Sequence, residues 1–249
     1  MFETTPTERT DVEALIASLR PRRCGFELIR LGPEADGGYL VPDDLADIAA
    51  VFSPGVGRTC GFELACVDRG MKAFLADGSV SEPPLRHPAF SFRKTFVATA
   101  TTTDTISMRD WIESSGVPPT ADLLLQMDIE GAEFDVLRHL PTADLNRFRI
   151  LVVEFHRLQR LWQPGFFQPT QEMFSRLLAS HACVHLHPNN CCGIDTAHGV
   201  EIPRTMEFTF LRRDRMTDGG PVPVCPHPLD RDNLPKATVA LPGLWQADA

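Results

Sequence analysis

The sequence predicts an α/β fold with a mostly parallel, seven-stranded sheet that ends in an antiparallel hairpin. Apolar strand segments alternate with helical segments from residue 48 to residue 182, which is the pattern of consecutive βαβ units. Two more strands then follow without a helix between them, which predicts a hairpin at one edge of the sheet. A chain of 249 residues, 43% of them hydrophobic, can bury the core of such a sheet without disulfides or metals.

Residues 1–47 are expected to form an N-terminal helix and a cap segment. Apolar side chains recur at helical spacing over residues 9–20, and residues 26–31 fit a short strand. Residues 36–39 (DGGY) predict a tight turn, because glycine tolerates the backbone angles that turns require. The apolar run after this turn ends at Pro42.

The main domain is expected over residues 48–213, where glycine, proline or aspartate ends most of the apolar runs. Strands are predicted at residues 48–52, 71–76, 90–98, 122–127, 149–155, 183–187 and 206–211. Helices are predicted at residues 60–69, 107–115, 130–140 and 169–181. Residues 214–249, which we call the C-terminal arm, hold six of the 21 prolines and show little periodicity. They are expected to wrap over the domain or to form a disordered tail.

The charge and hydropathy of the chain disfavour several classes of partner. The chain has 24 basic and 33 acidic residues, and this net charge of −9 disfavours binding to nucleic acid. Its longest apolar run is shorter than the roughly 18 residues that a membrane helix needs. Residues 1–11 lack the apolar stretch of a signal peptide. We therefore expect a cytoplasmic protein without a nucleic-acid or membrane partner, and its oligomeric state stays open.

The seven cysteines are odd in number and include no CxxC pair, which argues against a zinc knuckle or a thioredoxin-like motif. Most are expected to be reduced, partly buried thiols. Cys191 and Cys192 are adjacent in an expected loop, where a reactive thiol is one alternative.

The first candidate site is the glycine-containing loop at residues 53–57 (SPGVG). It lies between a predicted strand and a predicted helix, where Gly55 and Gly57 let the backbone approach a bound nucleotide. Asp77 follows Gly57 by 20 residues, at the end of the next strand, where an acidic side chain can bind both ribose hydroxyls. This pattern favours a nucleoside-type ligand, and the alternative is a structural turn with a solvated aspartate.

The second candidate site places three carboxylates, Asp128, Glu130 and Glu133, at the end of a strand and the start of a helix. Helix capping and the helix dipole account for one or two of them. Three within six residues exceed what capping requires. Ligands of open α/β sheets bind at this edge, so the group is a candidate binding site.

Two further candidates follow later strands. Glu154 and His156 end the strand after Asp128, so the sheet brings all three to one edge. A lone histidine at this place is commonly structural, but the two neighbouring carboxylates strengthen the alternatives of a general base or a metal ligand at His156. His187 and Asn189 follow the next strand, where we expect contacts with a substrate.

These motifs resemble the FkbM-type methyltransferases, a family of class I enzymes that use S-adenosylmethionine (SAM). The resemblance is strongest in residues 124–137, which contain an Asp-x-Glu-Gly-x-Glu signature. Further similar segments are residues 30–32 (RLG), 36–39 (DGGY), 53–57 (SPGVG), 62–63 (FE) and 187–190 (HPNN), with Glu207. The similarity spans about residues 28–213. It implies a Rossmann-like class I methyltransferase fold whose main domain binds SAM.

One position departs from the pattern of many class I enzymes, which carry an acidic residue at the end of the first strand. The chain has Ser53 there. The resemblance implies that the amino-acid part of SAM is then bound by Asp36, by Glu63 or by the backbone of Gly37 and Gly38. With Gly55, Gly57, Asp77 and Asp128, these residues form the expected cofactor site.

The resemblance implies methyl transfer to a hydroxyl of a small molecule or sugar. His156 or His187 is the expected base, with Glu154 beside it. A Mg²⁺ ion held by Asp128 and Glu154 is an alternative activator. Two other classes stay open: an NAD(P)-dependent oxidoreductase, which gives the carboxylate block no role, and a noncatalytic binding domain with the same fold.

Overall fold

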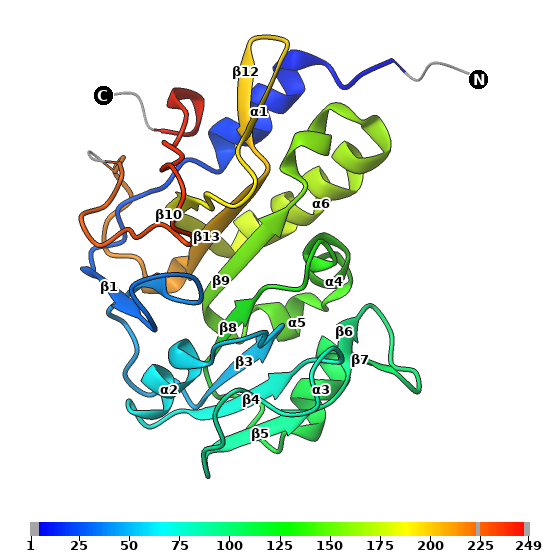
Figure 1. Ribbon diagram of the computed structural model, residues 1–249, viewed down its shortest axis with the longest axis vertical. Helices are drawn as coiled ribbons and strands as arrows, with labels where there is room; N and C mark the ends of the chain where they lie inside the picture. The colour runs from blue at the N-terminus through cyan, green and yellow to red at the C-terminus, as the bar shows by residue number, and fades with distance from the viewer. Residues whose placement is uncertain (1–4, 223–224, 247–249) are drawn as a thin grey trace.

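The computed structural model describes residues 5–222 and 225–246 (Figure 1). Its main sheet contains β3 (Ala50–Pro54), β4 (Lys72–Ala76), β5 (Phe90–Arg93), β8 (Leu123–Met127), β9 (Phe148–His156), β10 (His181–Pro188) and β13 (Thr205–Arg212). In the described residues the strand order is β10-β13-β9-β8-β3-β4-β5. β13 runs antiparallel to both of its neighbours, and the pairs from β9 to β5 are parallel. The predicted fold class is therefore confirmed.

Helices and small strand pairs cover this sheet. The helices are α1 (Arg9–Ser18), α2 (Gly61–Val67), α3 (Met108–Ser114), α4 (Glu133–His139), α5 (Thr142–Leu145) and α6 (Pro164–Ser180). The short 3₁₀ helices are η1 (Leu158–Trp162), η2 (Arg213–Arg215) and η3 (Gly243–Trp245). The strand pairs are β1 (Leu28–Leu31) with β2 (Tyr39–Pro42), β6 (Phe96–Ala98) with β7 (Thr105–Ser107), and β11 (Ile194–Ala197) with β12 (Val200–Pro203).

The sheet separates two hydrophobic cores because successive side chains of a strand point to opposite faces. Phe52 of β3 packs with Trp111 of α3 on one face, in a core that also contains side chains of α1, α4 and α6. Val51 belongs to the other core, with Phe62 of α2 and Tyr39 of β2. Figure 1 shows α2 on the opposite side of the sheet from α3, α4 and α6. The β1–β2 hairpin thus covers the same face as α2.

Three predicted elements differ from the structure. The predicted strand at 90–98 divides, because β5 pairs with β4 whereas β6 pairs with β7. The helix predicted from Glu130 begins only at Glu133, because Glu130 (φ 59°) and Gly131 (φ 106°) have positive φ. The helix predicted from Pro169 begins earlier, at Pro164, whose fixed φ suits a first helical turn. Pro169 therefore lies inside α6 and is not its start signal.

The N-terminal helix α1 and the C-terminal arm lie beside each other. Trp245 of the C-terminal arm is fully buried, packs edge-on against Phe208 of β13, and donates a hydrogen bond from Nε1 to the carbonyl of Glu201. α1 lies beside η3. The division of the chain at residues 48 and 213 stays a prediction, and residues 1–4, 223–224 and 247–249 lie outside the described residues.

Within the described ranges, no helix combines the length and apolar character needed to cross a membrane. The expected cytoplasmic location stays a prediction.

Candidate cofactor and acceptor site

Two adjoining cavities lie at the carboxyl ends of β3, β4 and β8. The first has a volume of about 270 Å³ and is bordered by Asp36, Glu63 and Gln126. The second, of about 330 Å³, is bordered by Asp77 and Phe96. Both cavities share the four residues Gly55, Gly57, Asp128 and Glu130. Each volume is near the lower end of the range for small-molecule sites.

The glycine loop after β3 is fixed in a conformation that needs glycine. Gly55 has φ 89°, and a Cβ built on it would lie 1.6 Å from the carbonyl oxygen of Asp128. Gly57 also has positive φ, but its missing Cβ faces open space. Gly55 therefore permits close contact between two loops, and Gly57 permits close approach by a ligand.

Asp77 holds this loop in place. Its Oδ2 accepts a hydrogen bond of 3.0 Å from the backbone N–H of Gly57, and its Oδ1 accepts two from Ser79. Burial alone would raise the pKa of Asp77, but these hydrogen bonds lower it below its usual value. Asp77 stays ionised, and its Oδ2, which accepts one of these hydrogen bonds, keeps a lone pair for a further donor.

Glu63 of α2 reaches the position where β3 ends in serine instead of an acid. Its buried carboxyl group is hydrogen-bonded to Ser53 Oγ. Ser53 Oγ also lies 2.8 Å from Gln126 Oε1, and Gln126 Nε2 donates to the Tyr39 hydroxyl at 3.3 Å. Burial raises the pKa of Glu63. A helix residue thus supplies the carboxyl group that the strand lacks.

Residues 36–39, the DGGY turn, contribute to the border of the first cavity. Asp36 and Gly37 border the first cavity, and Asp36 Oδ1 accepts a hydrogen bond of 3.2 Å from Asn233 Nδ2 in the C-terminal arm. Gly38 does not border either cavity. A Cβ there would lie 2.0 Å from the carbonyl oxygen of Pro33, so Gly38 serves the packing of the turn.

Asp128 lies where the two cavities meet. Its backbone N–H donates to the carbonyl of Pro54, which joins the ends of β8 and β3. Its Oδ1 is buried without a hydrogen-bond partner among the described residues. Burial raises the pKa of Asp128 to about 7, although His156 opposes this shift. The carboxyl group is thus suited to a ligand that donates hydrogen bonds or carries positive charge.

His156 is surrounded by carboxylates. Its Nδ1 lies 3.1 Å from Glu133 Oε1, which also accepts hydrogen bonds from the backbone N–H groups of Ile129 and Gly131. Its Nε2 lies 3.5 Å from Glu154 and 3.7 Å from Asp128. Burial alone would lower the pKa of His156, but Glu133 and the other carboxylates raise it. Glu133 therefore orients the ring and leaves Nε2 facing the site.

One group of three possible metal ligands occurs in the described residues. Asp128, Glu130 and His156 place ligand atoms within 4.8 Å of one another. Glu154, which the sequence suggested as a metal ligand with Asp128, is outside this group.

Glu154, Glu207 and His187 form a row across β9, β13 and β10. Glu207 is the direct cross-strand partner of Glu154 on one side and of His187 on the other. In-register side chains point to the same face of a sheet. This face is the one covered by the β1–β2 hairpin, because Thr209, two residues along β13, donates to the carbonyl of Leu40.

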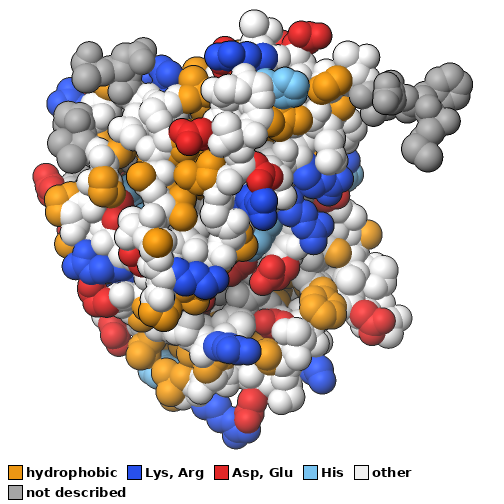
Figure 2. All heavy atoms as spheres, turned by 45° about the horizontal axis from the view of Figure 1, so that its top comes forward, with side chains coloured by type: hydrophobic (Ala, Val, Ile, Leu, Met, Phe, Trp, Pro, Cys, Tyr) orange, Lys and Arg blue, Asp and Glu red, His pale blue; other side chains and the backbone are white. Residues whose placement is uncertain are grey.

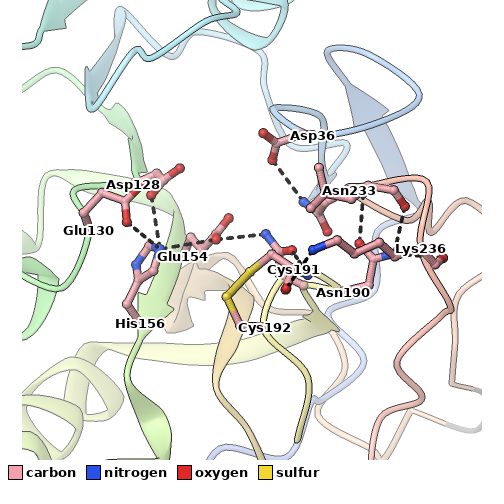
Figure 3. The surroundings of a disulfide bond; sticks show 12 residues. Asp36, Asp128, Glu130, Glu154, His156, Asn190, Cys191, Cys192, Asn233 and Lys236 are labelled. Atoms are coloured by element: carbon pink, nitrogen blue, oxygen red, sulfur yellow. Dashed lines mark hydrogen bonds and ion pairs between the residues drawn. A yellow bond between two sulfur atoms is a disulfide. The ribbon is translucent and has the colours of Figure 1, made fainter. Parts of the chain in front are cut away.

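Residues 189–193 form a loop beside this row (Figure 3). Asn189 Nδ2 donates to Glu154 Oε1 at 3.0 Å, and Asn190 Nδ2 donates to the carbonyl of Leu234 at 2.8 Å. In this loop Cys191 and Cys192 form a disulfide, so the alternative of a reactive thiol at this pair is wrong. The other five cysteines are free, and four of them are buried.

The structure thus gathers most of the predicted site residues. Asp36, Gly37, Gly55, Gly57, Glu63, Asp77 and Asp128 border the two cavities, and Glu154 and His156 lie beside Asp128. His187 is separate from His156 and instead lies 3.8 Å from Asp230 of the C-terminal arm. Sequence reasoning missed Gln126, Phe96 and Asn233. Asn233 had no signal, because it lies in a segment without periodicity.

The molecular surface in Figure 2 mixes acidic, basic and hydrophobic side chains. On the face shown, the positive side chains do not form a continuous stripe, which is what a nucleic-acid backbone would require.

The sheet order, the antiparallel β13 and the glycine loop at the carboxyl edge are those of a Rossmann-like class I methyltransferase. The model of a family described as the methyltransferase FkbM domain matches residues 50–183, which is more than half of the chain. The chain therefore belongs to the FkbM methyltransferase family and is a SAM-dependent methyltransferase. Among curated proteins, none matches the chain.

Proposed function

We propose that the chain transfers the methyl group of SAM to a hydroxyl of a small molecule or sugar. The observation that carries the proposal is the pair of cavities that meet at Gly55, Gly57 and Asp128, with Asp77 on one side and Glu63 on the other. SAM supplies an activated methyl group when bound, so the protein mainly has to orient donor and acceptor and to exclude water.

The second cavity suits the adenosine part of SAM. Asp77 Oδ2 can accept a further hydrogen bond from a ribose hydroxyl, and the half-exposed ring of Phe96 offers a flat apolar surface beside Val97 and Ile129. The first cavity suits the amino-acid part, because the carboxyl groups of Asp36 and Glu63 border it. Gly57 borders both cavities, and the open space at its missing Cβ leaves room for a ligand against the backbone.

His156 is the proposed base. A hydrogen bond from Nδ1–H to Glu133 leaves the Nε2 lone pair free to take the proton of the acceptor hydroxyl. The raised pKa makes this imidazole a stronger base than an unperturbed one. His187 is the weaker candidate, because burial lowers its pKa and it lies against Asp230. We therefore propose that His187 contacts the substrate.

A divalent cation is the alternative activator of the hydroxyl. The unpartnered Asp128 Oδ1 favours it, and Asp128, Glu130 and His156 would be its ligands. An imidazole in this set suits transition metals better than Mg²⁺, which prefers oxygen ligands. Methyl transfer at equal rates in EDTA and in added Mg²⁺ or Mn²⁺ would rule this role out.

Isothermal titration calorimetry tests the cofactor directly. We expect SAM and its demethylated product, S-adenosylhomocysteine (SAH), to bind with micromolar or tighter affinity, and NADH not to bind. Binding of NADH without SAM would support an oxidoreductase and contradict the proposal. Binding of SAM without methyl transfer to any hydroxyl compound in a small-molecule extract would support a noncatalytic domain.

A further inference from the structure

The row formed by Glu154, Glu207 and His187 contains two acidic groups side by side in the protein interior. Glu154 is 4% exposed and Glu207 5% exposed, and they are direct neighbours across β9 and β13. Like charges in this arrangement destabilise a sheet, and burial adds a desolvation cost for each carboxylate. Neither residue is near a helix start, so capping does not account for them.

Each of these carboxyl groups is only partly satisfied by the protein. Glu154 Oε1 accepts a hydrogen bond from Asn189, but Glu154 Oε2 is buried without a partner in the described residues. Glu207 Oε1 accepts a hydrogen bond of 2.7 Å from Asn233 Nδ2. The nearby Arg30 guanidinium lowers the pKa of Glu207 by its charge, but its Nε and Nη2 donate hydrogen bonds to the backbone carbonyls of Pro33 and Ala35.

Asn233 of the C-terminal arm, which lies over this row, contributes a second acceptor without a donor among the described residues. Asn233 uses Nδ2 to donate to both Glu207 and Asp36, and its buried Oδ1 has no partner among the described residues. In Figure 3 the side chains of Glu154 and Asp128 lie on one side of the view, opposite those of Asp36 and Asn233. Two buried acceptors here, Glu154 Oε2 and Asn233 Oδ1, thus lack a hydrogen-bond donor among the described residues.

We propose that the methyl acceptor carries a protonated amine, and that Glu154 and Glu207 bind this amine between them. An ammonium group has three N–H donors and no acceptor, which matches the unpartnered Glu154 Oε2 and Asn233 Oδ1 and the Glu207 carboxyl group, whose Oε1 accepts a hydrogen bond from Asn233. The inference rests on the proposed function and adds the acceptor class to it, namely amino sugars and amino alcohols.

A metal ion fits this pair less well than an amine. Asn189 and Asn233 already donate N–H groups to one oxygen of each glutamate, which leaves few oxygens for a cation that takes six ligands. The group of possible metal ligands in the described residues contains neither glutamate. Burial and the neighbouring carboxylates also raise the pKa of both groups, and a bound ammonium would favour their ionised forms.

The test is ligand-observed NMR with the full chain saturated with SAH. The probes are D-glucosamine and 2-aminoethanol, and their neutral counterparts are D-glucose, N-acetyl-D-glucosamine and ethylene glycol. We expect at least one amine to bind tenfold or more tightly than its neutral counterparts. The inference is wrong if no amine binds better than its counterparts.

Two isosteric variants refine the test. Glu207→Gln keeps the hydrogen bond from Asn233 but cannot ionise, and we expect it to reduce the preference for the amine about tenfold. Glu154→Gln is the second variant in case the first does not fold, and Glu172→Gln, on the exposed side of α6, is the matched control. An unchanged preference in a folded Glu207→Gln or Glu154→Gln protein would overturn the inference. SAH affinity, measured separately, reports on the proposed function and should stay unchanged in all three variants.

Discussion

Asp77 and Glu207 are both buried carboxyl groups over the same sheet, but the protein treats them differently. Asp77 accepts three hydrogen bonds from Gly57 and Ser79, and its pKa lies below its usual value. Glu207 accepts one from Asn233, and burial raises its pKa to about 8. The proposed cofactor side is thus held by hydrogen bonds within the protein, whereas the proposed acceptor side contains buried acceptors without a donor among the described residues.

The largest expected effect is the loss of catalytic rate when His156 is replaced. His156→Asn should lower kcat by about 10²–10⁴, because it removes the proposed base, while SAH affinity stays unchanged. Transfer of labelled methyl from SAM, with SAH titration, measures both quantities. His139→Asn, on an exposed turn of α4, is the control. Full activity of His156→Asn would remove His156 from the chemistry.

The second prediction concerns folding stability and pH. An acid whose pKa is higher in the folded state stabilises the fold below its unfolded pKa, and this contribution is lost as pH rises through the folded pKa. The pKa of Glu207 is near 4.5 in the unfolded chain and about 8 in the folded protein. The free energy of unfolding should therefore fall by about 3 kcal/mol as the pH rises from 5 to 8.

Glu207→Gln should remove that loss, so the variant gains stability relative to the parent at pH 8 but not at pH 5. Urea unfolding without ligand at both pH values measures the difference. Equal pH dependence in the two proteins would show that Glu207 is ionised in the fold and would weaken the contrast with Asp77. The charged or titratable groups that face Glu207 are Glu154, His187, Arg30, Asp36 and Asp230.

A third prediction concerns the close contact between Gly55 and Asp128, where the two cavities meet. Gly55→Ala should destabilise the fold by about 2 kcal/mol or more, because φ 89° is unfavourable for alanine and the new Cβ would collide with Asp128. Thermal unfolding measures the loss. Gly165→Ala in α6, where a Cβ meets nothing within 4 Å, should be neutral or slightly stabilising. Equal effects of both variants would show that the loop after β3 can rearrange.

The smallest expected effect is on cofactor affinity. Asp77→Asn keeps the size of the side chain but loses its charge, and we expect SAM to bind about tenfold more weakly, since one charged hydrogen bond contributes about 1.5 kcal/mol. Asp68→Asn, an exposed residue after α2, should leave the affinity unchanged. Unchanged affinity in Asp77→Asn would mean that Asp77 only holds the loop at Gly57.

The sequence predicted the strands of the main sheet because each is an apolar run between residues that break strands. It was less successful where a local signal was ambiguous. Pro169 is a start signal by propensity, but packing of α6 on the sheet extends the helix back to Pro164. The β11–β12 hairpin was missed, because residues 194–203 lack a strong alternation of apolar side chains.

The candidate site was predictable where its residues follow strands of a parallel sheet. Gly55, Asp77 and Asp128 are brought together by that topology alone, because the carboxyl ends of parallel strands meet at one edge. Glu63 was also found, but only through the family resemblance. Its contact with Ser53 depends on how α2 packs against the sheet.

The sequence by itself determined the class of fold, the edge of the sheet that holds the site and the family of the enzyme, because these depend on local periodicity and on motifs. Only the tertiary structure decided that Glu154 and Glu207 are neighbours and that Asn233 covers them. The register of an antiparallel strand pair and the path of the C-terminal arm depend on packing between distant segments. Spacing along the chain carries no information about either.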